Sequence, residues 1–226
     1  MSEKPASLEG QSDPWGNYGQ RMRRVRERAG LTLREAALRV GVNKNTLLRL
    51  ERGERLRKQT LVKICAGYGV LFLDPEAIPN REEGVHYALH RPEGEQWLRT
   101  RVNDLDGPSR VTRPRGIELA DQRRAMGRHG FADQFLMILG CDRAHGQLRA
   151  ALFEVFGQSG RSRQASGEAL VYAVKGDVQF HIGTESFVLR QGSAATFDRT
   201  VEHWHHPAES MAEEDLPAVF LYVQVD

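Results

Sequence analysis

The stretch that decides the fold of the first part of the chain, Tyr18–Gly53, reads YGQRMRRVRERAGLTLREAALRVGVNKNTLLRLERG. It contains two short helical patterns separated by a tight turn. Thr32 and Glu35 have capping-box spacing, which predicts a helix that begins there and ends at Gly41. Asn43 then caps a second helix, which the final glycine of the stretch ends. Two helices joined this closely must cross steeply, which leaves the second free to enter a groove.

Apolar residues recur in both helices at the spacing of one buried stripe: Leu33, Ala36, Ala37, Val40, Leu47 and Leu50. The polar residues of the second helix fall on its other faces: Lys44, Asn45, Arg49 and Arg52. The pattern therefore predicts one apolar face against a core and one polar face for a partner.

The stretch resembles the helix-turn-helix of the phage-repressor and xenobiotic-response-element (XRE) family of bacterial regulators. The resemblance covers about Tyr18 to Leu73 and includes Gly30-Leu31-Thr32, Ala37-x-x-x-Gly41-Val42 and Leu50-Glu51-x-Gly53. It implies an all-α, repressor-like DNA-binding domain of five helices, which we place at residues 17–75. The implied partner is double-stranded operator DNA. Such folds lay the second helix in the major groove, and dimers place two such helices about 34 Å apart.

Position in the second helix makes Lys44, Asn45 and Arg49 the predicted base readers. Lysine and arginine donate to guanine O6 and N7, and asparagine pairs with adenine, each contact discriminating by about 1–3 kcal/mol. Five further residues are placed for contacts to the DNA backbone: Arg34, Thr46, Arg55, Arg57 and Lys58. Arg26 and Glu51 occupy positions where this family commonly has a structural ion pair, so we assign both to the scaffold rather than to DNA.

The charge distribution supports a nucleic-acid partner although the net charge is only +2 over 226 residues. Residues 18–74 hold 14 Lys and Arg against 5 Asp and Glu, a net +9, and the remainder of the chain is −7. A basic module of this kind supplies salt-dependent affinity by releasing the counterions condensed on phosphate. The acidic remainder should avoid the duplex.

The composition is that of an ordinary globular chain of two modest domains, with 40% hydrophobic residues. No stretch approaches the roughly 20 apolar residues needed to span a bilayer, and Met1–Gln20 lacks the apolar core of a signal peptide. We therefore expect a cytoplasmic protein that does not enter a membrane. Cys65 and Cys141 fall in different modules and are expected to be free thiols.

Two segments have weak patterns. Residues 1–16, rich in Ser, Pro, Gly and Asp, are expected to be a flexible tail. Residues 76–129 are expected to form a connecting region partly packed on the second domain. Within it we expect a hairpin of Gly84–His90 with Gln96–Val102, a loop over Asp104–Arg115, and a short helix over Ile117–Gly127.

From Phe131 the pattern changes to short apolar or alternating runs divided by turn residues, which predicts a sandwich or barrel. The segments Gly167–Gly176, Val178–Gly183 and Phe197–His203 resemble the core of the cupin superfamily. The resemblance implies a C-terminal cupin or jelly-roll-like β-barrel, placed at residues 130–226. The fold class expected is thus a multi-domain α and β chain.

Cupins usually bind a divalent metal through two histidines, a glutamate and a third histidine. The matching positions here hold Arg163, Ala165 and Ala169, with only His203 retained. Alanine has no donor atom and arginine is a permanent cation, so we expect neither a metal nor another cofactor. A substitute set would need Glu168, which strand alternation directs to the opposite face.

Strand alternation predicts that Arg163, Val171, His203 and His205 line the interior, where they would bind an organic, carboxylate- or phosphate-bearing ligand. The alternative is an empty, packed barrel that only dimerises the chain. Together these features predict a non-enzymatic transcriptional regulator that binds its operator as a homodimer. Two alternatives stay open: a cupin enzyme with a DNA-targeting domain, and an antitoxin-like protein that binds its own promoter.

Overall fold

The computed structural model describes residues 13–68, 81–83, 87–90, 97–102, 110–112, 116–141, 148–164 and 166–225. These residues fall in two compact units, a helical one and one that contains all the strands. The expected tail lies largely outside the described residues, as does any fifth helix beyond Tyr68. None of the described helices is long and apolar enough to cross a membrane.

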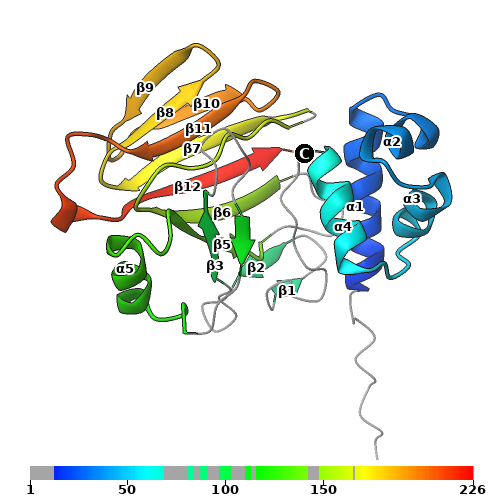
Figure 1. Cartoon of the computed structure of the whole chain (residues 1–226), viewed down its shortest axis with the longest axis horizontal. Helices are drawn as coiled ribbons and strands as arrows, with labels where there is room; N and C mark the ends of the chain where they lie inside the picture. Colours follow the sequence, from blue (N-terminus) through cyan, green and yellow to red (C-terminus); the bar gives the residue numbers. More distant parts are fainter. Residues whose placement is uncertain are drawn as a thin grey trace, which may run out of the picture. The chain divides into compact units, whose positions relative to one another are not determined.

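The helical unit contains four described helices (Figure 1): α1 (Pro14–Arg28), α2 (Leu33–Val40), α3 (Lys44–Glu51) and α4 (Lys58–Tyr68). The predicted capping box is present, since the Glu35 amide donates to Thr32 Oγ1 at 3.3 Å and the Thr32 amide donates to Glu35 Oε2 at 2.8 Å. Gly41 ends α2 with a φ of 65°, a conformation that favours glycine. Both helices of the turn are therefore confirmed.

The core of this unit contains the predicted apolar stripe. Its buried members include Tyr18, Met22, Val25, Ala36, Ala37, Val40, Leu47, Leu50, Leu61 and Ile64. Helix α1 crosses α3 at Gly19, where an added Cβ would lie 2.2 Å from the Leu50 carbonyl oxygen. This distance excludes any side chain at Gly19, so the two helices touch through their backbones.

The described strands of the second unit form three sheets. The largest has seven strands in the order β10-β7-β12-β6-β5-β3-β4, the second is β11-β8-β9, and the third is β1-β2 (Figure 1). Their bounds are β1 (Arg81–Glu83), β2 (Ala88–His90), β3 (Trp97–Arg101), β4 (Arg110–Thr112), β5 (Gln134–Leu139), β6 (Leu148–Val155), β7 (Glu168–Lys175), β8 (Val178–Ile182), β9 (Glu185–Leu189), β10 (Ala194–Asp198), β11 (His203–Pro207) and β12 (Ala218–Val225). Helix α5 (Ala120–Arg128) precedes β5.

Two hydrophobic cores are formed by the described residues of this unit. The first lies between the seven-stranded sheet, which contributes Val171 and Phe220, and the three-stranded sheet, which contributes Phe180 and Leu189. The sheets thus pack face to face as a jelly-roll-like sandwich. The second core contains Trp97, Ile117, Ala132, Phe135, Met137 and Phe156, with Met126 of α5 packed against it.

The connecting region differs from the sequence expectation. Strand β2 pairs with β1, and β3 pairs with β4 and β5, so the expected hairpin of Gly84–His90 with Gln96–Val102 is wrong. Residues 110–112, expected to be loop, form β4. The expected short helix is confirmed as α5. The errors share one cause: these strands pair with partners that short-range sequence patterns do not specify.

Candidate DNA-binding surface

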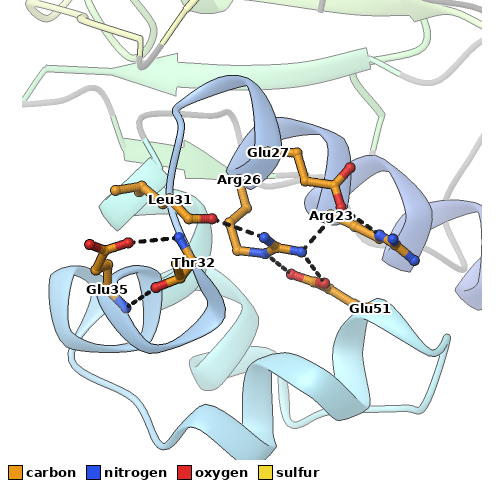
Figure 2. Close-up of polar contacts among 7 residues, drawn as sticks. All are labelled: Arg23, Arg26, Glu27, Leu31, Thr32, Glu35 and Glu51. Carbon is orange, nitrogen blue, oxygen red and sulfur yellow. Dashed lines mark hydrogen bonds and ion pairs between the residues drawn. The ribbon is translucent and has the colours of Figure 1, made fainter.

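A buried ion pair sets the position of α3 against α1 (Figure 2). Arg26 donates from Nε to Glu51 Oε1 at 2.6 Å and from Nη2 to Glu51 Oε2 at 2.8 Å. Its Nη1 donates to the Leu31 carbonyl at 2.9 Å, so one guanidinium links α1, the following turn and α3. The two side chains are only 10% and 6% exposed, which confirms their expected role in the scaffold.

The face of α3 turned away from the core carries the predicted base readers. Lys44, Asn45 and Arg49 are exposed, while Thr46 is half-buried. Asn43 Oδ1 accepts from the Asn45 amide at 2.8 Å, so the helix has a side-chain cap. The arrangement presents three long or polar side chains from one rigid helix, whose opposite face is anchored in the core.

Arg49 has a carboxylate neighbour that the sequence analysis did not foresee. Its Nε donates to Glu54 Oε2 at 2.6 Å, across the end of α3. Both side chains are about half exposed, so this pair contributes little to stability. Because the bond uses Nε, the two terminal amino groups of Arg49 remain as donors.

The predicted backbone-contact residues flank α3 in the chain. Arg34 is exposed at the start of α2, and Arg55, Arg57 and Lys58 are exposed in the segment that leads into α4. The Arg55 guanidinium lies 5.9 Å from the centre of the Trp15 ring. These cations belong to the same compact unit as the base readers.

Of the four predicted ligand residues of the second unit, three face inward and one is exposed. Val171 is fully buried between the sheets and His203 is 8% exposed. His205 packs against the rings of Phe153, Phe180 and Phe220. Arg163, by contrast, is exposed, and its Nε donates to the Thr200 carbonyl at 2.7 Å.

The two inward histidines are uncharged at neutral pH. Burial lowers the pKa of His205 to about 3, and burial also lowers that of His203. Gln134 Oε1 lies 3.2 Å from His205 Nε2, and Ser159 Oγ accepts from the His205 amide at 2.8 Å. Sequence reasoning missed both partners, since nothing in the spacing of Gln134 or Ser159 relates them to His205.

A family model described as a helix-turn-helix domain matches residues 17–75 of the chain. The match coincides with the capped helix pair and its buried ion pair. Residues 17–75 are a helix-turn-helix domain. No curated protein matches the sequence. The helix-turn-helix domain contains all eight residues predicted to contact DNA, from Arg34 to Lys58.

The chain resembles many solved structures, among them the three that follow. An HTH_3 family transcriptional regulator from Vibrio cholerae is 17% identical, with 95% of this chain and 99% of that chain covered and a TM-score of 0.43. Hydroxypropylphosphonic acid epoxidase from S. wedmorenis is 13% identical, with 96% and 100% covered and a TM-score of 0.42. KdgF from Halomonas sp. is 13% identical, with 41% and 78% covered and a TM-score of 0.35. At TM-scores below 0.5, these likenesses decide neither the ligand nor the activity of this chain.

Proposed function

We propose that the protein is a sequence-specific transcriptional regulator that binds double-stranded DNA through α3 of its helix-turn-helix domain. The observation that carries the proposal is the exposed row of Lys44, Asn45 and Arg49 on a helix fixed by the buried Arg26–Glu51 pair. Rigid placement matters because a base edge is recognised only when the donors arrive in fixed geometry. The proposal implies a cytoplasmic protein, since that is where bacterial operators lie.

Each predicted contact residue has a chemical role in the proposal. Arg49 and Lys44 would donate to guanine in the major groove, and Asn45 would pair with adenine. The remaining cations and Thr46 would fix the register by contacts to phosphate, which carry no sequence information: Arg34, Arg55, Arg57 and Lys58. The net charge of +9 over residues 18–74 supports the assignment of phosphate contacts, because positive charge gives affinity for DNA of any base sequence.

The experiment is a titration by fluorescence anisotropy of the region upstream of the protein's own gene, with an unrelated duplex as competitor. We expect Arg49→Ala to lose about tenfold or more of the specific affinity, the equivalent of one good bidentate base contact. Arg39→Ala, which removes an exposed arginine of α2, is the matched loss of charge. It should weaken specific and non-specific binding alike. If both variants lost the same share of specific and of non-specific affinity, the assignment of Arg49 as a base reader would be refuted.

We further propose that the protein acts as a homodimer, because operator recognition by this type of domain pairs two recognition helices. An apolar surface on the seven-stranded sheet supports a second copy as partner. On β7, Leu170, Tyr172 and Val174 are 39%, 40% and 45% exposed. Leu221 and Val223 of β12 lie directly beside Tyr172 and Leu170. A row of exposed apolar side chains on a flat sheet is typical of a protein interface.

The second unit is proposed to sense a small organic ligand whose occupancy alters the affinity for DNA. Val171, His203 and His205 would supply the interior contacts, and Arg163, which is exposed rather than interior as expected, would meet a carboxylate or phosphate from the solvent side. Because both histidines are neutral, Arg163 is the only one of these four residues that supplies positive charge. The proposal includes no catalytic step, since the family's metal-ligand positions hold Arg163, Ala165 and Ala169.

A ligand can change DNA affinity only if it binds two conformations unequally. The test is therefore to compare DNA affinity with and without small molecules that copurify with the protein, in wild type and in Arg163→Ala. An unchanged response in Arg163→Ala would remove Arg163 from the ligand site.

A further inference from the structure

The outer face of the three-stranded sheet carries a row of aromatic and histidine side chains. In the pairing of β11 with β8, Trp204 lies opposite His181 and His206 lies opposite Gln179. Phe180 and His205, the alternate residues of the same strands, face the core between the sheets. Because successive side chains of a strand point to opposite faces, the row lies away from that core.

Stacking contacts hold this row together. The His181 and Trp204 rings are stacked, with centres 4.6 Å apart and planes 3° from parallel. The Arg161 guanidinium lies 4.3 Å from the centre of the Trp204 ring and forms an ion pair with Glu202 at 2.7 Å. The His181 ring is therefore braced by a stack that begins with an anchored cation.

At the end of this row, two imidazole nitrogens converge. Nε2 of His181 and Nε2 of His206 are 3.1 Å apart. Zinc binds imidazole nitrogen at 2.0–2.1 Å in tetrahedral geometry, which places two nitrogen ligands about 3.3 Å apart. The observed separation is thus close to that of two ligands of one ion.

The hydrogen bonding of His206 also suits a ligand. Its Nδ1 lies 2.8 Å from the Pro207 carbonyl oxygen, which can only accept, so Nδ1 carries the hydrogen and the neutral ring has its lone pair on Nε2. A backbone carbonyl that orients the second nitrogen is the common outer contact of metal-binding histidines.

We propose that His181 and His206 form a two-nitrogen binding site for a borderline divalent cation such as Zn²⁺ on the outer face of the three-stranded sheet. On binding, the hydrogen that His181 donates to His206 moves to its Nδ1, and both Nε2 lone pairs coordinate the ion. Within the described part of the chain, no three His, Cys, Asp or Glu side chains converge on one point. In the proposed site, water and an exchangeable ligand would occupy the remaining coordination positions.

This site is separate from the inward positions where cupins hold their metal. His203 and His205 face the core, one residue out of phase with His206. The sequence predicted an interior position for His203 and His205 and assigned no role to His206. Pairing with His181 could not be seen there, because it depends on the register between β8 and β11.

The test is a calorimetric titration of the full-length, tag-free chain with ZnCl₂. We expect one ion per chain in wild type, and at least tenfold weaker binding in His181→Ala and in His206→Ala. His129→Ala, which removes an exposed histidine just after α5, should bind as wild type does. His206→Gln keeps a polar side chain of similar length and guards against a folding defect, and it should lose the ion as well.

Electron paramagnetic resonance with Cu²⁺ gives an independent readout. Two coordinated imidazoles are expected in wild type and one in His206→Gln. Unchanged zinc affinity in the His181 and His206 variants, or equal loss in His129→Ala, would overturn the proposal and leave a plain hydrogen bond between two histidines.

Discussion

Glu51 shows how one carboxylate can control a binding surface that it does not touch. It accepts two hydrogen bonds from Arg26, while its own helix presents Arg49 and its neighbours on the opposite side. A charge buried to this degree is stable only while its partner is present. Removing the carboxylate would leave the buried Arg26 guanidinium with the longer, 3.4 Å contact to the half-exposed Glu27 as its remaining ion pair.

We therefore expect Glu51→Ala to lower the free energy of unfolding of the helical unit by about 3 kcal/mol. The measurement is urea denaturation followed by far-ultraviolet circular dichroism. Glu54→Ala is the control, because the Arg49–Glu54 pair is about half exposed and such pairs contribute little. Equal destabilisation by both variants would contradict the assignment of Glu51 as a buried anchor.

The capping box gives a pH dependence with a definite sign. The hydrogen bonds from Thr32 lower the pKa of Glu35 below its ordinary value near 4.3. A depressed folded-state pKa stabilises the fold above the unfolded pKa, and this contribution is lost as the pH falls through the folded value. The melting temperature of wild type should thus fall more steeply below about pH 4 than that of Thr32→Ala, which lacks the side-chain hydroxyl that contributes most to the lowered pKa of Glu35. Parallel curves would show that the Thr32 hydroxyl does not affect how stability depends on pH.

At the scale of elements, the crossing of α1 and α3 depends on Gly19. Replacing a helical glycine with alanine ordinarily stabilises a helix by roughly 0.5–1 kcal/mol. Here the added Cβ would collide with the Leu50 carbonyl, which belongs to the backbone and cannot rotate away. We expect Gly19→Ala to destabilise by about 1–3 kcal/mol in the same urea experiment. Gln20→Ala, on the exposed neighbour, should have little effect, and a stabilised Gly19→Ala would contradict the close crossing.

The elements differ in how far the sequence could predict them. Helices α2 and α3 follow from signals a few residues apart, such as Thr32 with Glu35, and β7 follows from strict alternation. The pairing of β3 with β5 joins segments about 35 residues apart, with a helix between them. The residues proposed to contact DNA could be predicted from the sequence, because they lie on one short helix and the segments next to it. Two pairs could not be predicted in this way: Arg123 with Glu154, and His181 with His206. Each pair depends on how elements distant in the sequence are aligned with one another.

At the scale of the whole molecule, the outer face of the seven-stranded sheet differs from end to end. At one end α5 covers it. There Arg123 of α5 forms an ion pair with Glu154, and the Arg123 guanidinium lies 3.5 Å from the centre of the Trp97 ring. Along β7 the outer face is exposed and apolar. This difference favours the β7 region as the surface at which two copies meet.

Tyr172→Lys should therefore convert the proposed dimer into a monomer of 25.5 kDa in light scattering coupled to gel filtration. A lysine at the centre of an apolar interface would bring an unpaired charge out of water. Val188→Lys alters a similarly exposed residue on β9 and should leave the mass at the dimer value. A dimer in both variants would place the interface elsewhere.

The three tryptophans give the protein an internal set of optical probes. Trp15 lies in α1, Trp97 in the core beneath α5, and Trp204 on the outer face of the three-stranded sheet. Each is close to an arginine, although in a different structural region. Variants that keep one tryptophan and replace the others with phenylalanine would therefore report separately on three regions of one chain. Stopped-flow emission from such variants would reveal the order in which these regions form during folding.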